Sequence, residues 1–534
     1  MFWEFGALSR KTLLAAFRGA SMLDDLPRGV RSRKLHEQQT PLSAWLDPAA
    51  ISQSNTLRFG PSKIFLGVVG GTVSDDGLEP VVRGGTALGL GDDRHAVLCA
   101  GSRAGKGRSC LIPTLLEYAG SVIALDPKGE LANVTARRRA ALGQRVCIVD
   151  PFGVCAERLA GFKVGFNPLA LLAPDSPTLI ADAGLVADAV VVGSAHADPH
   201  WDESARNLIE GIILHVATYP KYENARTLVT VRELLKRAFD KVTDLPEGFE
   251  GEPPPQMRTE MVHNASIVAE SNEGLAAALE GAARDFYDKA DRERASVLSV
   301  ALRNTKFLDY PSLRESLSSH GFDLAQLKTA SAGLTIYLCL PAGRMATCNR
   351  WFRLFVNLAI EAMERERARP KIPVLLVLEE FHVLGFMQQI EVAAALVAGF
   401  GMKLLIVLQD LTQLKRHYKD GWETFLGNAG VMIFFGNNDM TTLDYISKRC
   451  GQTSLIIERK NEVTTGQRMS GATGTSWSLE VRDLLTPEEA SRFFGRDDNE
   501  QRQLLIRPGL PPAIIQRVKY DKHEMFRGKF DAPA

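Results

Sequence analysis

A glycine-containing segment with a lysine, residues 95–109, carries the residue types of a phosphate-binding site. It opens with the apolar run Ala96–Cys99, typical of a buried parallel strand, and passes through a turn and Lys106 to a predicted helix over Leu111–Tyr118. Loop amides and a helix N-terminus present positive ends to an anion, and the lysine reaches the outer phosphates. The residues predicted to bind the phosphates are Gly101, Ser102, Arg103, Ala104, Gly105, Lys106, Gly107 and Arg108.

This loop departs at two places from the usual phosphate-loop pattern. The pattern opens with a glycine six residues before the lysine, where this chain has Ala100 followed by Gly101. It closes with a serine or threonine that holds Mg²⁺, where this chain has Gly107. For this segment alone, a tight strand-to-helix turn with a surface lysine stays open as an alternative.

A second apolar run far downstream, Pro373–Leu378, ends in the carboxylates Glu379 and Glu380. In phosphate-loop ATPases such a strand runs beside the first one and carries acids to the metal and to the attacking water. We predict that Glu379 faces Mg²⁺, directly or through a water, and that Glu380 is the general base. The alternative is an ordinary buried strand with a solvated acidic end.

A third strand is predicted over Leu404–Leu408, and Gln409 follows it. A polar side chain at that strand end, next to the acidic strand, can touch the γ-phosphate and report its loss. Together, the loop and the acids predict an ATPase that uses ATP and Mg²⁺. Its predicted catalytic residues are Lys106, Glu379, Glu380 and Gln409.

The composition is that of an ordinary globular protein, with 534 residues, 45% hydrophobic and 24% charged. Lys and Arg together number 63, as do Asp and Glu, so any nucleic-acid surface must be local. The seven cysteines form no CxxC pair and no other metal-ligand spacing, which fits a reducing cytoplasm. The sequence contains no run of about eighteen apolar residues, so no transmembrane helix is predicted. An amphipathic helix is predicted over residues 5–23.

The order of the predicted elements gives an α/β fold with an inserted all-α domain. Residues 1–60 are predicted as a helical and linker segment. A hairpin is predicted from Ile64–Gly71 and Pro80–Arg83, and strand–helix alternation follows the phosphate loop. The predicted motor domain comprises residues 61–184 and 326–534. The inserted domain, residues 185–325, includes predicted helices at 201–219, 231–239, 267–283 and 292–305, and an exposed loop at 244–261.

Six short motifs in this order resemble the signatures of the TraG/TraD/VirD-type coupling proteins of conjugation and type IV secretion. They are Asp126-Pro-Lys-Gly-Glu130, Phe166-Asn-Pro-Leu169, Asp198-Pro-His-Trp201, Glu379-Glu-Phe381, Gln409-Asp-Leu-Thr-Gln-Leu414 and Arg507-Pro-Gly-Leu-Pro-Pro512. The resemblance covers roughly residues 60–520 and implies a RecA-like P-loop ATPase assembling as a homo-hexamer. It also implies partners: relaxase-bound single-stranded DNA or protein effectors, and channel components at the inner membrane. Gly107 in place of Ser or Thr recurs in the TraG-like branch.

The chain also departs from the family's pattern. Members usually begin with transmembrane helices, and none is predicted in this sequence. We therefore expect this variant to be cytoplasmic and peripheral to the inner membrane through partners. The first acid of the pair is commonly Asp rather than Glu379. No arginine lies between Phe381 and Met402, where related motors often carry one that serves a neighbouring subunit. The candidates for such a cation are Arg344, Arg353, Arg416 and Arg449.

Two other functions stay open. One is a duplex DNA translocase of the FtsK kind, which shares the motor core, although the large helical insertion argues against it. The other is a nucleotide-binding receptor or scaffold with little hydrolysis, because Glu379 and Gly107 both affect the metal site. Residues Lys415–Lys419, which combine basic and aromatic side chains, are a candidate pore-facing loop, and a solvated helix end is the alternative.

Overall fold

The computed structural model describes residues 43–77, 79–193, 198–245, 250–460 and 475–533. The chain divides into two compact units, Met1–Ala44 with Cys450–Leu484, and Trp45–Arg449 with Leu485–Ala534. In the first unit the described residues form an antiparallel ribbon of β12 (Gln452–Lys460) and β13 (Thr475–Asp483), which the sequence did not predict. The predicted domain limits stay predictions.

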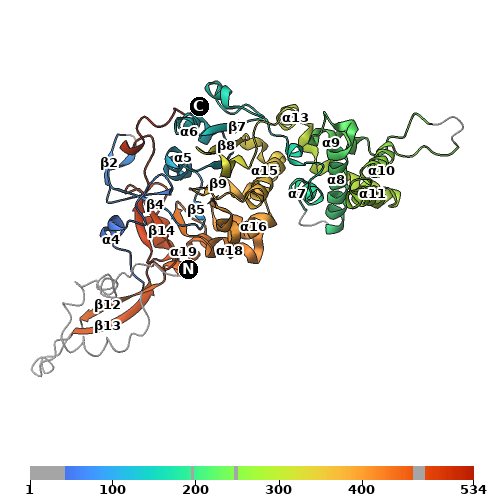
Figure 1. Ribbon diagram of the computed structural model, residues 1–534. Helices are drawn as coiled ribbons and strands as arrows, with labels where there is room; N and C mark the ends of the chain where they lie inside the picture. The colour runs from blue at the N-terminus through green and yellow to red at the C-terminus, as the bar shows by residue number, and fades with distance from the viewer. Residues whose placement is uncertain (1–42, 78, 194–197, 246–249, 461–474, 534) are drawn as a thin grey trace, which may run out of the picture. The chain divides into compact units, whose positions relative to one another are not determined.

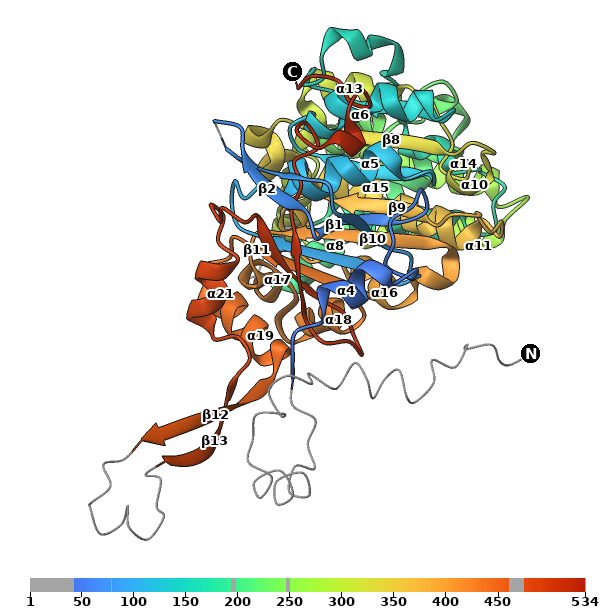
Figure 2. The ribbon, with the colours of Figure 1, turned by 90° about the vertical axis from the view of Figure 1, so that its left-hand side faces the viewer.

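The second unit contains a sheet that, among the described residues, has eleven strands (Figures 1 and 2). Their order is β4 (Thr86–Leu90), β1 (Ile64–Val69), β15 (Ala513–Gln516), β14 (Arg502–Ile506), β11 (Val431–Phe435), β5 (Ala96–Ala100), β10 (Met402–Leu408), β9 (Val374–Leu378), β6 (Val122–Asp126), β8 (Leu334–Cys339) and β7 (Arg145–Val149). The strands from β11 to β7 are parallel, and the rest pair antiparallel. The predicted α/β fold with a mainly parallel sheet is confirmed.

The central strands β5, β9, β10 and β11 are buried along their whole length. Strands covered on both faces read as continuous apolar runs, which is why the sequence predicted them correctly. One face packs on α5 (Ile112–Glu117) and α6 (Glu130–Ala141), which join a single hydrophobic core with the strands. The sheet is therefore a rigid base for the polar residues that follow its strands.

The helices between β7 and β8 confirm the predicted all-α insertion (turquoise at α7, green from α8 to α11 and yellow-olive at α13 in Figure 1). They are α7 (Leu179–Val190), α8 (Pro199–Thr218), α9 (Leu228–Lys236), α10 (Gln256–Val268), α11 (Glu273–Tyr287), α12 (Asp291–Asn304), α13 (Pro311–Ser318) and α14 (Gln326–Thr329). The family motif beginning at Asp198 caps α8, because the Asp198 carboxylate accepts a bond of 3.0 Å from His200 N.

Two predictions about the insertion are wrong. The helix predicted over residues 267–283 is the end of α10 and most of α11, because Asn272 caps α11 by accepting a bond of 3.0 Å from Leu275 N. The loop predicted over 244–261 ends early, since α10 begins at Gln256.

The predicted hairpin before the phosphate loop is also wrong. The Ile64 strand, β1, pairs with β4 and β15, and the hairpin is formed by β2 (Thr72–Asp75) and β3 (Pro80–Arg83). The helix predicted over residues 5–23 lies outside the described residues. Within the described part of the chain, no helix combines the length and the apolar character needed to cross a membrane.

Candidate nucleotide site

The phosphate loop follows β5, which lies between β11 and β10. Gly101 N donates to Phe435 O (3.2 Å), and a Cβ on Gly101 would stand 2.0 Å from Gly436 O. Only glycine fits there, so position 101 requires one. The loop then turns through two left-handed residues, Arg103 (φ 57°) and Gly105 (φ 92°), before helical structure begins at Gly107.

Lys106 points back into this loop. Its Nζ donates to Ala100 O (3.0 Å) and Gly101 O (3.4 Å), and its side chain is buried. Burial lowers the pKa of Lys106, and the carboxylates of Glu380 and Glu379 oppose that shift. The lysine and both acids therefore share one electrostatic environment, as the sequence predicted for a nucleotide site.

The expectation that the acidic strand runs directly beside the phosphate-loop strand is wrong. β10 lies between β5 and β9, with Leu408 opposite Cys99 and Ile406 opposite Leu378. The residue that follows β10, Gln409, is therefore placed between the phosphate loop and the acids. Its predicted position next to the acidic strand is confirmed.

Glu380 and Gln409 are in direct contact. Gln409 Nε2 donates to both carboxylate oxygens of Glu380, at 2.9 and 3.2 Å, and His382 Nδ1 lies 3.4 Å from Glu380 Oε2. Glu380 has a left-handed backbone (φ 53°), an uncommon conformation for a residue other than glycine. Such strain at a strand end often accompanies function, because the surrounding structure must maintain it.

Asn437 completes this edge and was not predicted as a site residue. It follows β11, and its Nδ2 donates to Gln409 O at 3.1 Å. The sequence did contain a signal, since a polar residue after a buried parallel strand reaches the same sheet edge as Gln409.

Acidic side chains gather at the ends of β9 and β6, where Asp126 is buried and Glu379 is half-buried. The pKa of Glu379 is raised to about 8, first by burial and then by the carboxylates of Asp126, Glu130 and Glu380, while Lys128 acts in the opposite direction. Burial also raises the pKa of Asp126 to about 6, and its Oδ1 has no hydrogen-bond partner among the described residues. A bound cation would stabilise the ionised forms of carboxylates that repel one another in this way.

These residues fit Mg²⁺, with Glu379 as the candidate ligand. Mg²⁺ usually binds through one or two carboxylates together with substrate phosphates, so a full protein cage is not needed. Accordingly, the described residues contain no group of three or more His, Cys, Asp or Glu that could hold a metal by themselves. A Cβ on Gly107 would meet no atom within 4 Å, so space remains where other phosphate loops carry a hydroxyl.

We expect Glu379→Gln to change how stability depends on pH. Because the folded-state pKa of Glu379 is raised to about 8 from 4.5, the carboxyl favours folding while protonated. That contribution is complete below about pH 4.5 and is lost as pH rises through about 8. Melting temperatures of the metal-free chain between pH 5 and 9 should therefore fall less steeply in Glu379→Gln than in the parent. Equal slopes would show that Glu379 is ionised throughout.

The remaining predicted loop residues differ in their surroundings. Ser102 and Arg103 are exposed at the tip, and Ala104 is buried. The Arg108 guanidinium is already paired, with Glu79 (2.6 Å) and Asp521 (2.5 Å), so its predicted contact with nucleotide would rest on its main-chain N–H.

Arg353 is unsuited to serve a neighbouring subunit. It is buried on α15 (Met345–Arg365), where its guanidinium donates to the carbonyls of Ala189, Leu384 and Phe386 at 2.7–3.2 Å. The other three candidates for such a cation, Arg344, Arg416 and Arg449, are exposed.

Of the two interpretations of Lys415–Lys419, the helix end is confirmed and the loop is wrong, and a role in facing the pore stays a prediction. All but the last of these residues form the end of α17 (Leu411–Tyr418), and Tyr418 is buried with its ring 5.9 Å from Phe381 and 4.6 Å from Phe425. The aromatic residue anchors the helix, and Lys415 and Arg416 remain on its exposed side.

Known proteins resemble this chain over most of its length. The family model for type IV secretory system conjugative DNA transfer matches residues 64–533. The conjugal transfer protein TraG of Escherichia coli is 27% identical over 468 residues, covering 82% of this chain and 69% of TraG. The type IV secretion system-coupling protein VirD4 of Bartonella henselae is 26% identical over 439 residues, covering 80% of this chain and 62% of VirD4.

Solved structures share the fold. The bacterial conjugative coupling protein TrwBdeltaN70, in a trigonal form with sulphate, superposes with a TM-score of 0.58 at 13% identity, covering 90% of this chain and 96% of that one. The predicted RecA-like fold with a helical insertion is thereby confirmed, and so is the resemblance to coupling proteins. The chain belongs to the type IV secretory system conjugative DNA transfer family.

Proposed function

We propose that this chain is an ATP-driven coupling protein that recruits relaxase-bound single-stranded DNA or effector proteins to a type IV secretion channel and drives their transfer. The observation that carries the proposal is the placement of Lys106, Gln409 and Glu380 along one edge of the sheet, in the segments that follow the neighbouring strands β5, β10 and β9. Family membership supports the coupling role, and the relatives TraG and VirD4 carry it in their names.

The binding of ATP and Mg²⁺ is supported by two further TrwB structures. TrwB has been solved with the non-hydrolysable ATP analogue ADPNP and with ADP and Mg²⁺, at TM-scores of 0.56 and 0.55 and at 14% and 15% identity. In this chain the loop amides and Lys106 would hold the phosphates, and Glu379 would hold the metal. The bound Mg²⁺ would neutralise charge on the phosphate oxygens.

Hydrolysis would begin with Glu380, which takes a proton from the attacking water. Gln409 now bonds both oxygens of that carboxylate. To polarise a water, Glu380 must free at least one oxygen, and an amide drawn toward the γ-phosphate would release it. Gln409 would thus couple nucleotide occupancy to the availability of the base.

Transport requires assembly and substrate contact. The site lies at a sheet edge where a neighbouring subunit of a homo-hexamer would add a cation, and Arg344, Arg416 and Arg449 remain candidates for it. The helical insertion contains none of the proposed catalytic residues, so it is our candidate for substrate selection. Channel components would hold the chain at the inner membrane, with residues 1–60 as the proposed contact.

A receptor with little hydrolysis is a second candidate function, favoured by Glu379 and Gly107 at the metal site. A duplex translocase is a third possibility, which the choice of DNA strand would separate from our proposal.

Binding of labelled oligonucleotides to the full chain with ADPNP tests the proposal. We expect single strands to bind more tightly than duplexes, and binding to weaken steeply with salt because the contacts are mainly to phosphate. A preference for duplex would favour the translocase. Exchanging the insertion, residues 185–325, for that of a relative should alter partner choice while ATP turnover is kept. A chimera that turns over ATP but keeps its original partner would refute the role of the insertion.

A further inference from the structure

The C-terminal segment Arg517–Asp521 lies against the phosphate loop. It follows β15 and contacts the loop at two places. Arg517 Nη1 lies 3.4 Å from Ala104 O, and Tyr520 N donates to Arg108 O at 3.2 Å. A segment more than four hundred positions away in sequence therefore bonds the main chain on both sides of Lys106.

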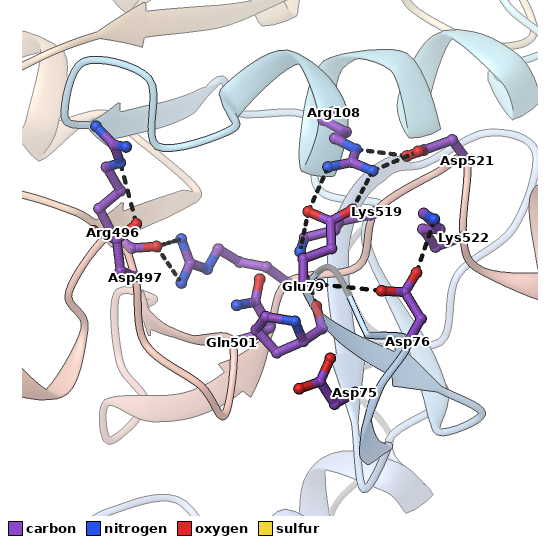
Figure 3. A network of polar contacts seen from close by, with 12 residues as sticks. Asp75, Asp76, Glu79, Arg108, Arg496, Asp497, Gln501, Lys519, Asp521 and Lys522 are labelled. Carbon is purple, nitrogen blue, oxygen red and sulfur yellow. Dashed lines mark hydrogen bonds and ion pairs between the residues drawn. The ribbon is translucent and has the colours of Figure 1, made fainter.

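Side chains reinforce the second contact. Arg108 Nε and Nη2 donate to the two oxygens of Asp521, at 2.6 and 2.5 Å, and Arg108 also pairs with both oxygens of Glu79 at 2.9 and 2.6 Å (Figure 3). Lys519 Nζ lies 2.7 Å from Glu79 Oε2. The pKa of Glu79 is lowered to about 2, mainly by the hydrogen bonds from Arg108. Two-pronged pairs of this kind fix geometry as well as charge.

Arg517 differs from the other charged residues of this segment, because it is a buried cation with no carboxylate bonded to it among the described residues. Its guanidinium donates to the carbonyls of Gly495 and Arg496 at 3.2–3.3 Å, in addition to Ala104, and lies 4.9 Å from the ring centre of Phe435. Burial lowers its pKa to about 10, so it remains charged at neutral pH. A buried charge satisfied mainly by carbonyls is costly, and Arg517 differs from the similarly buried Arg353 and Arg139 in that one of its carbonyls, that of Ala104, belongs to the phosphate loop.

The contact with Ala104 determines which way the loop amides face. The carbonyl of Ala104 and the N–H of Gly105 belong to one trans peptide plane and point in opposite directions. When Arg517 holds the carbonyl, the Gly105 N–H is directed away from Arg517. That N–H lies next to Lys106, among the amides that a phosphate would use.

We propose that Arg517 is a positioning residue of the nucleotide site, which holds the Ala104–Gly105 peptide so that the phosphate loop is ready for the β-phosphate. This inference rests on the proposed function, because it concerns the same nucleotide. The positive charge of Arg517, close to the loop, also adds to the electrostatic potential that attracts the phosphate.

Nucleotide affinity of the full chain tests the proposal, measured with fluorescent ADP and with ADPNP for Arg517→Met and Arg517→Lys. Without the contact between Arg517 and Ala104 the loop would be in its binding-competent conformation only part of the time, which weakens the apparent affinity by that fraction, so we expect Kd to rise roughly 10- to 100-fold in Arg517→Met, equally for both nucleotides. Arg517→Lys keeps the charge but not the several bonds, so its Kd should lie between those of the parent and Arg517→Met.

The matched control is Arg139→Lys, which alters another buried guanidinium bonded to carbonyls, those of Leu115, Tyr118 and Gly120 on α5 and the turn after it. It should lower the melting temperature yet leave Kd within about twofold. If Arg517→Met does not fold, the Kd values of Arg517→Lys for the two nucleotides decide the test. Folded Arg517 variants with parental Kd for both nucleotides would overturn the proposal. A parent chain that binds no nucleotide would instead refute the proposed function.

Discussion

Lys106→Ala should lose ATP binding and, with it, all measurable turnover. The ammonium is the cation nearest the loop carbonyls, at 3.0 Å from Ala100 O, and the loop amides alone cannot neutralise the outer phosphates. Loss of charge-assisted bonds to two phosphates predicts a Kd raised by roughly 100-fold or more. Titration with a fluorescent ATP analogue measures this directly.

The control for this substitution is Lys371→Ala, which removes an exposed lysine that precedes β9. Its affinity should equal that of the parent, and melting curves of both variants should show that the fold is kept. If Lys106→Ala binds ATP as tightly as Lys371→Ala, the loop after β5 is an ordinary turn and the nucleotide site lies elsewhere.

The second large effect is expected from Glu380→Gln, which should bind ATP like the parent but hydrolyse it roughly 10²–10⁴ times more slowly, the usual contribution of a positioned general base. An amide has nearly the same shape as the carboxylate and keeps an acceptor for Gln409 Nε2, so the left-handed turn at Glu380 should persist. Single-turnover hydrolysis, measured beside the binding titration, separates the two effects.

Glu488→Gln is the matched control, since Glu488 is exposed on α21 (Pro487–Phe493). It should hydrolyse ATP at the parental rate. If Glu380→Gln also does so, Glu380 is not the base, and Glu379 becomes the carboxylate to test.

Parallel strands were the most predictable part of this fold. β5, β9 and β10 are buried along their whole length, so each appears in the sequence as a largely apolar run. Their order in the sheet was not predictable, because β10 enters between β5 and β9 through tertiary packing that no local pattern records. The ribbon β12–β13 was missed because it is not a compact apolar run.

The same distinction applies to the site. Lys106, Glu380 and Gln409 lie in the segments that follow predicted strands, and the structure brings them to one edge as predicted. Arg517 could not be found this way, since its partner Ala104 lies 413 residues away. For the Lys415–Lys419 run the sequence left a loop and a helix end open, because its charges fit both, whereas buried Tyr418 determines its structure.

Steady-state ATP turnover by the full chain, with and without single-stranded DNA over a range of protein concentrations, tests the central claim most directly. An ATP-driven coupling protein should hydrolyse ATP faster with DNA, and its rate should rise more than linearly with concentration because a neighbouring subunit completes each site. Glu380→Gln should lack this activity in the same assay. A parent chain that binds ATP yet shows no turnover above Glu380→Gln, at any concentration and with any DNA, would contradict the motor and support the receptor.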